Sequence, residues 1–234
     1  MGAPLQFIIP HGRAPLRGFF LTWTTKVPSD PTEKKKTLKL VQGPVANLPT
    51  RYGNFKITIF REDDRLDHAM VFMGDLADGR PVLCRIHSEC LTGDVFGSLR
   101  CDCGFQLAAA LGAIAEEGRG ALLYMRQEGR GIGLFNKIRA YRLQDGGLDT
   151  VDANLRLGFD ADERHYGVCG HMMRAMGFDH VILMTNNPAK INSITKHGII
   201  VTERRALEYG RNRYNEGYLE TKAERMGHLL HHQD

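Results

Sequence analysis

The sequence has no long apolar run, no marked excess of charge of either sign and no regular spacing of cysteines. Without about eighteen consecutive apolar residues, no membrane-spanning helix is expected. A net charge of +4 is too small to argue for nucleic acid or a membrane as a partner. The five cysteines are odd in number and mostly clustered. We therefore expect reduced thiols and a cytoplasmic protein without disulfides.

The first 47 residues predict little structure. Residues 1–29 carry basic residues and no acid, as a transit peptide would, but several prolines interrupt them. Residues 27–36 are polar and broken by proline, which is typical of a linker. We interpret residues 1–47 as an N-terminal extension, residues 48–230 as one folded domain and residues 231–234 as a short tail.

Hydrophobic periodicity predicts a chain with two kinds of secondary structure. Residues 55–60 alternate with period two, and residues 69–73 and 81–84 are short apolar runs, which predicts an antiparallel β unit. After residue 103, helices and strands alternate, which indicates a mixed α/β core, so that the fold is α+β overall. The predicted helices are 105–118, 132–143, 160–177, 188–197 and 218–230, and the predicted strands are 121–125, 180–185 and 199–202.

Three cysteines lie within the segment 85–106, at Cys90, Cys101 and Cys103. Three thiolates are soft ligands suited to zinc, and they leave a fourth tetrahedral position open, as in a catalytic site. A structural zinc completed by a fourth protein ligand is the alternative. On spacing alone, that ligand could be His87, Cys84 or Cys169.

Two turns between a predicted strand and a predicted helix could bind anions. Residues 126–133, Arg-Gln-Glu-Gly-Arg-Gly-Ile-Gly, combine glycines, helix-start N–H groups and two arginines, which suits a di- or triphosphate. Residues 185–190 place Thr185 and Lys190 in a similar position. Each segment could instead be an ordinary turn, because neither is a known phosphate-loop fingerprint. Beside a zinc site, they favour metal-assisted hydrolysis of a nucleotide.

Several segments resemble, in order, the signature segments of GTP cyclohydrolase II. They are residues 87–94 (His-Ser-Glu-Cys-Leu-Thr-Gly-Asp), 99–106 (Leu-Arg-Cys-Asp-Cys-Gly-Phe-Gln), 126–133, 137–141 (Lys-Ile-Arg-Ala-Tyr), 185–188 (Thr-Asn-Asn-Pro) and 218–230. The resemblance covers roughly residues 48–230, which makes that domain the catalytic one. It implies the first step of riboflavin biosynthesis, in which GTP becomes 2,5-diamino-6-hydroxy-4-(5-phosphoribosylamino)pyrimidine and releases formate and pyrophosphate.

The resemblance also implies the site residues and the cofactors. One zinc ion per subunit would be held by Cys90, Cys101 and Cys103, and magnesium would bind with the triphosphate of the GTP substrate. Members of the family are usually homodimers. The residues implied for catalysis are Tyr141, Asp162 and Arg164, and those implied for GTP binding are Arg85, Ile86, His87, Ser88, Glu89, Gln106, Glu128, Gly129, Arg130, Thr150, Thr185 and Lys190.

Chemistry qualifies some of these implied roles. Asp162 could accept a proton, and Glu128 or Glu89 could accept hydrogen bonds from the guanine amide and amino groups. The family mechanism makes Arg164 a nucleophile, but a guanidinium stays protonated, so we prefer a clamp on the α-phosphate. Two alternative functions remain. One is a paralogue that opens the guanine ring but keeps the formyl group, and the other is a non-catalytic guanine-nucleotide-binding protein with a structural zinc.

Overall fold

A single mixed sheet organises the computed structural model, which describes residues 39–230. Most of the predicted N-terminal extension and the predicted tail lie outside the described residues. The strands lie in the order β1-β3-β4-β6-β5-β7-β8, and β2 also pairs with β3. Across the sheet the strand numbers rise except between β6 and β5, where the order is reversed. The strands are β1 Leu40–Gln42, β2 Ala46–Thr50, β3 Gly53–Glu62, β4 Leu66–Met73, β5 Val82–Ser88, β6 Gly120–Met125, β7 His180–Met184 and β8 Ile200–Arg205.

The sheet has an antiparallel half and a parallel half. Strands β1 to β4 pair antiparallel, which confirms the predicted β unit, and β5 to β8 pair parallel. The two halves are continuous, because β4 pairs antiparallel with β6, with Val71 opposite Leu122. The sheet also begins at Leu40, ahead of the boundary predicted at residue 48. The predicted mixed α/β fold is therefore confirmed. Its antiparallel and parallel parts belong to one continuous sheet and are not separate units.

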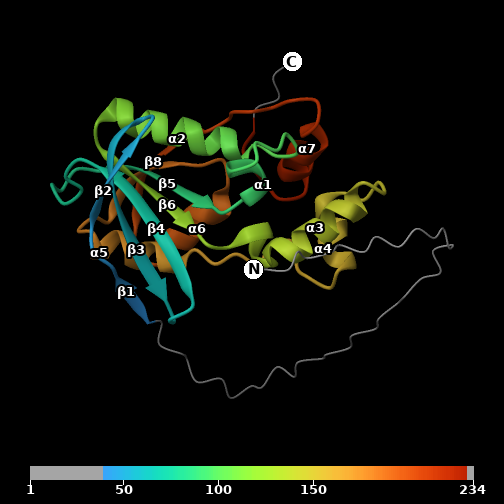
Figure 1. The fold of residues 1–234 in the computed structure, drawn as a ribbon, viewed down its shortest axis with the longest axis horizontal. Helices are drawn as coiled ribbons and strands as arrows, with labels where there is room; N and C mark the ends of the chain where they lie inside the picture. The colour runs from blue at the N-terminus through green and yellow to red at the C-terminus, as the bar shows by residue number, and fades with distance from the viewer. Residues whose placement is uncertain (1–38, 231–234) are drawn as a thin grey trace, which may run out of the picture. The chain divides into compact units, whose positions relative to one another are not determined.

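Helices cover both faces of this sheet. They are α1 Leu91–Asp94, α2 Cys103–Glu117, α3 Gly133–Gln144, α4 Thr150–Arg156, α5 Gly167–Ala175, α6 Pro188–Lys196 and α7 Glu216–Glu224, with a 3-10 turn η1 at Glu128–Gly131. Figure 1 shows α2 on one face and α5 on the other. The core follows this division, because Leu122 of β6 packs with Ile114 of α2, whereas its neighbour Leu123 packs with Met172 of α5.

The helix predicted over residues 160–177 was wrong in its first half. Residues 160–166 are irregular, and α5 begins only at Gly167. The Asp162 carboxylate accepts the backbone N–H of Arg164 at 3.1 Å, a local bond that competes with helix formation. The helix α4 was not predicted, and its cap is Asp149, whose side chain accepts the N–H of Asp152 at 2.8 Å.

The last predicted helix is shorter than expected. Helix α7 ends at Glu224, and Gly227 adopts the left-handed conformation with φ 64°. The chain then turns, so that the N–H of Leu229 donates to the carbonyl of Asn186 at 2.8 Å. This contact attaches the end of the described chain to the segment that follows β7.

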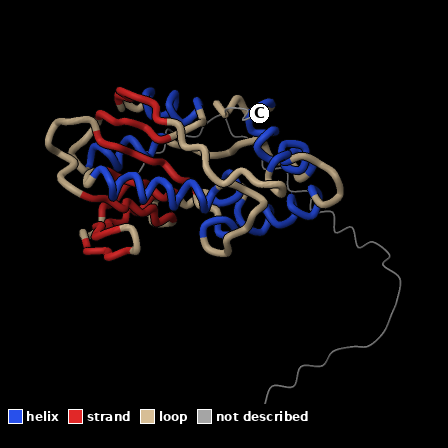
Figure 2. The backbone as a smooth tube through the Cα atoms, turned by 90° about the horizontal axis from the view of Figure 1, so that it is seen from above, coloured by secondary structure: helices blue, strands red, loops and turns tan. Residues whose placement is uncertain are grey.

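The carboxyl ends of β5, β6 and β7 lie side by side, because β6 and β7 both pair parallel with β5. In Figure 2 the strands lie at one end of the view. In Figure 1 helices α3, α4 and α7 lie to the right of the strands, beyond these carboxyl ends. Ligands commonly bind where parallel strands end and strand order reverses. Within residues 39–230, no helix has both the length and the apolar character that a membrane crossing requires.

Candidate active site

A pocket of about 1110 Å3, counting its open mouth, lies at these strand ends. All three predicted metal ligands line it. So does every predicted catalytic and nucleotide-binding residue except Ile86, Glu128 and Asp162. Ile86 contributes its carbonyl, which accepts a hydrogen bond from Lys190 Nζ at 2.8 Å. Segments far apart in the sequence therefore meet in one cavity.

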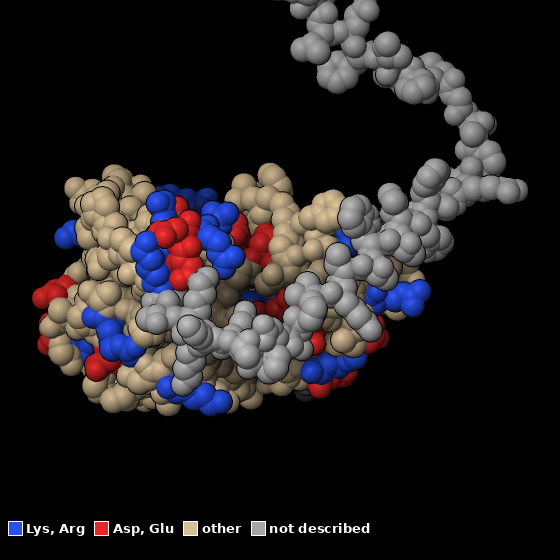
Figure 3. Space-filling model, turned by 90° about the horizontal axis from the view of Figure 1, so that it is seen from below, with Lys and Arg blue, Asp and Glu red and all other residues tan. Residues whose placement is uncertain are grey.

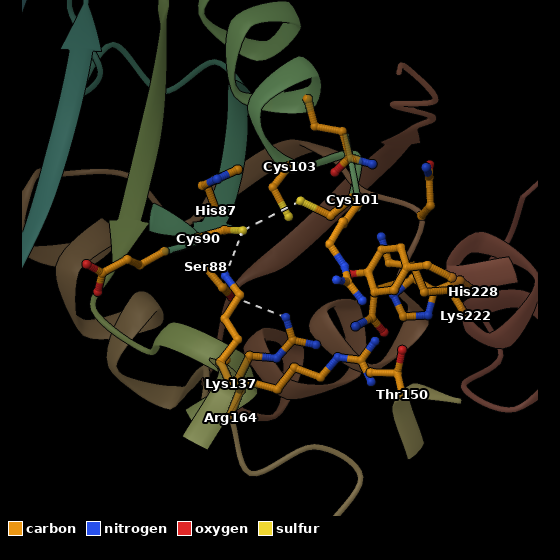
Figure 4. Close-up of a pocket in the computed structure, with 18 of the residues that line it drawn as sticks. His87, Ser88, Cys90, Cys101, Cys103, Lys137, Thr150, Arg164, Lys222 and His228 are labelled. Carbon is orange, nitrogen blue, oxygen red and sulfur yellow. Dashed lines mark hydrogen bonds between the residues drawn. The ribbon is translucent and has the colours of Figure 1, made fainter. Parts of the chain in front are cut away.

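The three thiols form one compact cluster (Figure 4). The sulfur atoms of Cys90, Cys101 and Cys103 all lie within 4.8 Å of one another. Two glycines permit this approach. A Cβ on Gly104 would meet the carbonyl oxygen of Gly93 at 2.3 Å, and a Cβ on Gly93 would meet Cys101 Sγ at 2.8 Å. A side chain at either glycine would push the thiol-bearing segments apart, so the backbone itself brings the three sulfurs together.

This donor set suits a soft divalent ion. Sulfur atoms at this separation can reach one tetrahedral centre, for which zinc is the common choice. Among residues 39–230, the groups that could hold a metal include only these three thiols. His87 was a possible fourth metal ligand on sequence spacing alone. Its Nε2 lies 3.0 and 3.1 Å from the two carboxylate oxygens of Asp94. Cys169 instead lies 3.6 Å from the Met125 sulfur in the core.

Lys137 and Glu128 lie directly behind the thiol cluster. Lys137 Nζ donates to Cys90 Sγ at 3.2 Å and to Glu128 Oε1 at 2.8 Å. The Glu128 carboxylate also accepts the backbone N–H groups of Leu91 and Gly129, at 2.7 and 2.8 Å. Because three donors occupy this carboxylate outside the pocket, the geometry does not support guanine recognition by Glu128. It holds the loop in place instead.

The turn η1 has a strained backbone next to the pocket. Gly129 and Arg130 both have positive φ, 63° and 62°, and this conformation is uncommon for a residue with a side chain. It directs the Arg130 guanidinium to within 5.7 Å of the Tyr218 ring centroid, at the pocket wall. Strain of this kind concentrates at ligand-binding sites.

Basic side chains dominate the lining of the pocket. Burial, together with the positive charges of the neighbouring Lys222 and Arg164, lowers the pKa of His228 to about 3, so its ring is neutral. On the face drawn in Figure 3, by contrast, acidic and basic side chains are intermixed. The concentration of basic side chains is therefore local to the pocket, where it would suit an anion, and its members are Arg85, Arg100, Arg130, Lys137, Arg164, Lys190 and Lys222.

Asp162 acts on the pocket through Arg164. Its carboxylate accepts Arg164 Nε at 2.7 Å and Nη2 at 2.5 Å, which leaves Nη1 facing Ser88 Oγ at 3.4 Å. Burial raises the pKa of Asp162, but the hydrogen bonds and charge of Arg164 outweigh burial and hold that pKa below its usual value. Burial likewise lowers the pKa of Arg164, and Asp162 reverses this so that the net change is a rise. Asp162 therefore fixes the orientation of the Arg164 guanidinium and keeps it charged.

Tyr141 lies on α3 and lines the pocket. Its hydroxyl is 3.3 Å from Thr92 Oγ1, and the Arg100 guanidinium stacks 4.5 Å from its ring centroid. Burial raises the pKa of Tyr141, so the phenol stays protonated near neutral pH. The pocket lining thus includes a phenol that keeps its proton near neutral pH.

Helix α7 supplies pocket residues that the sequence analysis did not assign. Lys222 Nζ donates to both carboxylate oxygens of Asp102, at 2.8 and 2.9 Å, and Asp102 lies between two of the thiols in the sequence. Asp102 also accepts Gln106 Nε2, and Gln106 accepts Arg85 Nη2, both at 2.6 Å. The segment 218–230 was part of the resemblance, but only the fold shows that it returns to the thiol loop.

Replacing Lys222 by methionine is expected to lower the free energy of unfolding by about 3 kcal/mol, because it leaves the Asp102 carboxylate buried without its cation. Urea unfolding followed by circular dichroism would measure the change. The double variant Lys222→Met/Asp102→Asn should recover most of the loss, since it removes the uncompensated charge. Equal losses in the single and double variants would contradict this account.

Comparisons with known proteins agree with this geometry. The sequence model of the GTP cyclohydrolase II family matches residues 42–206. GTP cyclohydrolase-2 of Actinobacillus succinogenes is 60% identical over 188 residues, which cover 80% of this chain and 87% of the relative. The same-named proteins of Haemophilus influenzae (59% over 189 residues, 80% and 88%) and Pseudomonas aeruginosa (58% over 186 residues, 79% and 91%) are similar to a like degree. The chain belongs to the GTP cyclohydrolase II family and is an enzyme of that type.

Proposed function

We propose that this enzyme hydrolyses GTP in a zinc-dependent reaction that yields 2,5-diamino-6-hydroxy-4-(5-phosphoribosylamino)pyrimidine, formate and pyrophosphate, the first step of riboflavin biosynthesis. The observation that carries the proposal is the joining of a three-thiol cluster and a strongly cationic region in one pocket. An enzyme that hydrolyses a nucleoside triphosphate at its base needs both parts. One is a centre that activates water near the base, and the other is a group of cations that binds the phosphates.

Cys90, Cys101 and Cys103 would hold the zinc, in agreement with their spacing and soft donor atoms. Zinc bound there would lower the pKa of a water and supply a nucleophile near neutral pH. The chain's part is to present carbon 8 of the guanine ring to this position. Tyr141, which keeps its proton, would donate to a ring nitrogen as the imidazole opens.

Glu89 is the better candidate for guanine recognition. It lines the pocket, and its Oε2 accepts Arg126 Nε at 2.8 Å, which fixes the carboxylate in place. Guanine offers an amide N–H and an amino group to a carboxylate, whereas adenine offers no such pair of donors. Glu128, by contrast, has its carboxylate occupied by Lys137 and two backbone N–H groups.

The basic residues of the lining would bind the triphosphate together with magnesium. Arg130 of η1 and Lys190 of α6 line the pocket from separate elements and could bracket the chain of phosphates. Arg164, held by Asp162 with Nη1 directed toward Ser88 of the pocket lining, would stabilise charge at the α-phosphate as pyrophosphate leaves. Asp162 then orients Arg164, and its lowered pKa makes it a weak proton acceptor.

Product analysis tests the proposal. Purified protein incubated with GTP, zinc and magnesium is expected to release formate and pyrophosphate in equal amounts and to form the diaminopyrimidine. Ring opening without free formate would favour the paralogue that keeps the formyl group. Recovery of unchanged GTP, with tight GTP binding, would favour a non-catalytic sensor. Magnesium, the homodimer and the cytoplasmic location stay predictions from the resemblance and from composition.

A further inference from the structure

Lys137 is a buried cation whose ammonium group faces the thiol cluster (Figure 4). Only 8% of Lys137 is exposed, although it belongs to α3, whose neighbouring residues Ile138 and Arg139 are exposed. Its Nζ lies 3.2 Å from Cys90 Sγ and 2.8 Å from Glu128 Oε1. Burying a lysine is costly, so its place against a sulfur needs a reason beyond packing.

Three thiolates create a chemical difficulty for a metal that must activate water. Each thiolate donates charge to the ion, and three of them together weaken its pull on a bound water. A hydrogen bond donated to a ligating sulfur withdraws charge from that sulfur, and such outer contacts tune metal centres. Among the described residues, Lys137 donates such a bond from a full positive charge to one of the three sulfurs.

Glu128 fixes the direction of this bond. Its carboxylate is held by the N–H groups of Leu91 in α1 and Gly129 in η1, and it accepts Lys137 Nζ through Oε1. The lysine therefore has two anchored partners and little freedom to leave the sulfur. Two hydrogen bonds donated by Lys137 therefore connect Glu128 in the η1 turn with Cys90 in the cluster.

We infer that Lys137 is a positioning residue that withdraws charge from the Cys90 thiolate, and so keeps an ion held by three thiolates electrophilic enough to activate water. This inference rests on the proposed metal site. A purely structural role is the competing account, in which the Lys137–Glu128 ion pair only ties η1 to α3. The two accounts differ in what happens when both members of the ion pair are removed together.

Cobalt(II) is the probe, because its thiolate-to-metal charge-transfer bands report the charge donated by sulfur. In full-length Lys137→Met loaded with cobalt(II), these bands should shift to lower energy than in the wild type, since the unbonded thiolate donates more strongly. The rate of formate release should fall as well.

Two further variants separate the accounts. Lys137→Met/Glu128→Gln removes the ion pair without leaving a buried unpaired carboxylate, so it should fold well and still show the shifted bands. Arg139→Met removes an exposed cation from the same helix and should leave the bands in place. Unshifted bands in both Lys137 variants would overturn the inference while leaving the metal site intact. If wild-type protein shows no thiolate–cobalt band at all, the proposed metal site fails, and this inference fails with it.

Discussion

Replacing Cys101 by serine is expected to leave a folded protein that has lost its metal and nearly all its turnover. A serine oxygen is a poor substitute for a thiolate toward a soft ion, and two remaining thiolates bind weakly. Loss of an outer-shell partner already costs about 10- to 100-fold, so removal of a ligand should cost more. Metal content by atomic absorption and formate release from GTP would measure the two losses.

The matched control is Cys169→Ala, a buried cysteine beside Met125 and outside the cluster. It should keep its metal and its turnover and lose about 1 kcal/mol of stability at most. A structural zinc predicts the opposite pattern for Cys101→Ser, with the thermal midpoint falling sharply as the fold is lost. That result would contradict a catalytic centre held by an independently folded chain.

Replacing Arg164 by lysine is expected to lower kcat by about 10²- to 10³-fold, the cost of losing one oriented donor to a developing charge. Lysine keeps the charge but cannot reproduce the paired contacts of Nε and Nη2 with Asp162, which aim Nη1 at the pocket. Steady-state pyrophosphate release would measure kcat, and GTP binding to the variant should weaken much less.

The control for Arg164→Lys is Arg139→Lys, at an exposed position of α3, which should keep the wild-type rate. A near-full rate in Arg164→Lys, or a covalent phosphoryl adduct on that variant detected by mass spectrometry, would contradict the clamp. The raised pKa of Arg164 favours the clamp, because a guanidinium that stays protonated has no lone pair to offer.

The strands from β3 to β8 were predictable because their patterns are local, whereas the short β1 and β2 were not predicted. Residues 55–60 alternate with period two and form the middle of β3, and the apolar run 121–125 fills both faces of the sheet as β6. The segment 160–166 was not predictable in the same way. Its acidic start resembles a helix N-terminus, but the Asp162 side chain bonds locally and then pairs with Arg164.

The site shows the same division between local and distant information. The spacing of the thiols predicted a cluster, since Cys101 and Cys103 are neighbours and the turn through Gly93 returns Cys90 to them. The place of Lys222 depends on more than a hundred intervening residues, and only the folded chain brings it to Asp102. Glu128 lies within a recognisable motif, yet its sequence could not reveal that backbone N–H groups and Lys137 occupy its carboxylate.

The contact between Gly104 and the carbonyl of Gly93 has a consequence for residues that donate no ligand atom. In a zinc finger the ion gathers its ligands by itself. Here packing of one glycine against the other also holds the segments that carry Cys90 and Cys103 together. The capacity of the three thiols to share one ion is therefore a property of two backbone positions as much as of the sulfur atoms, and a single methyl group at position 104 would be enough to disturb it.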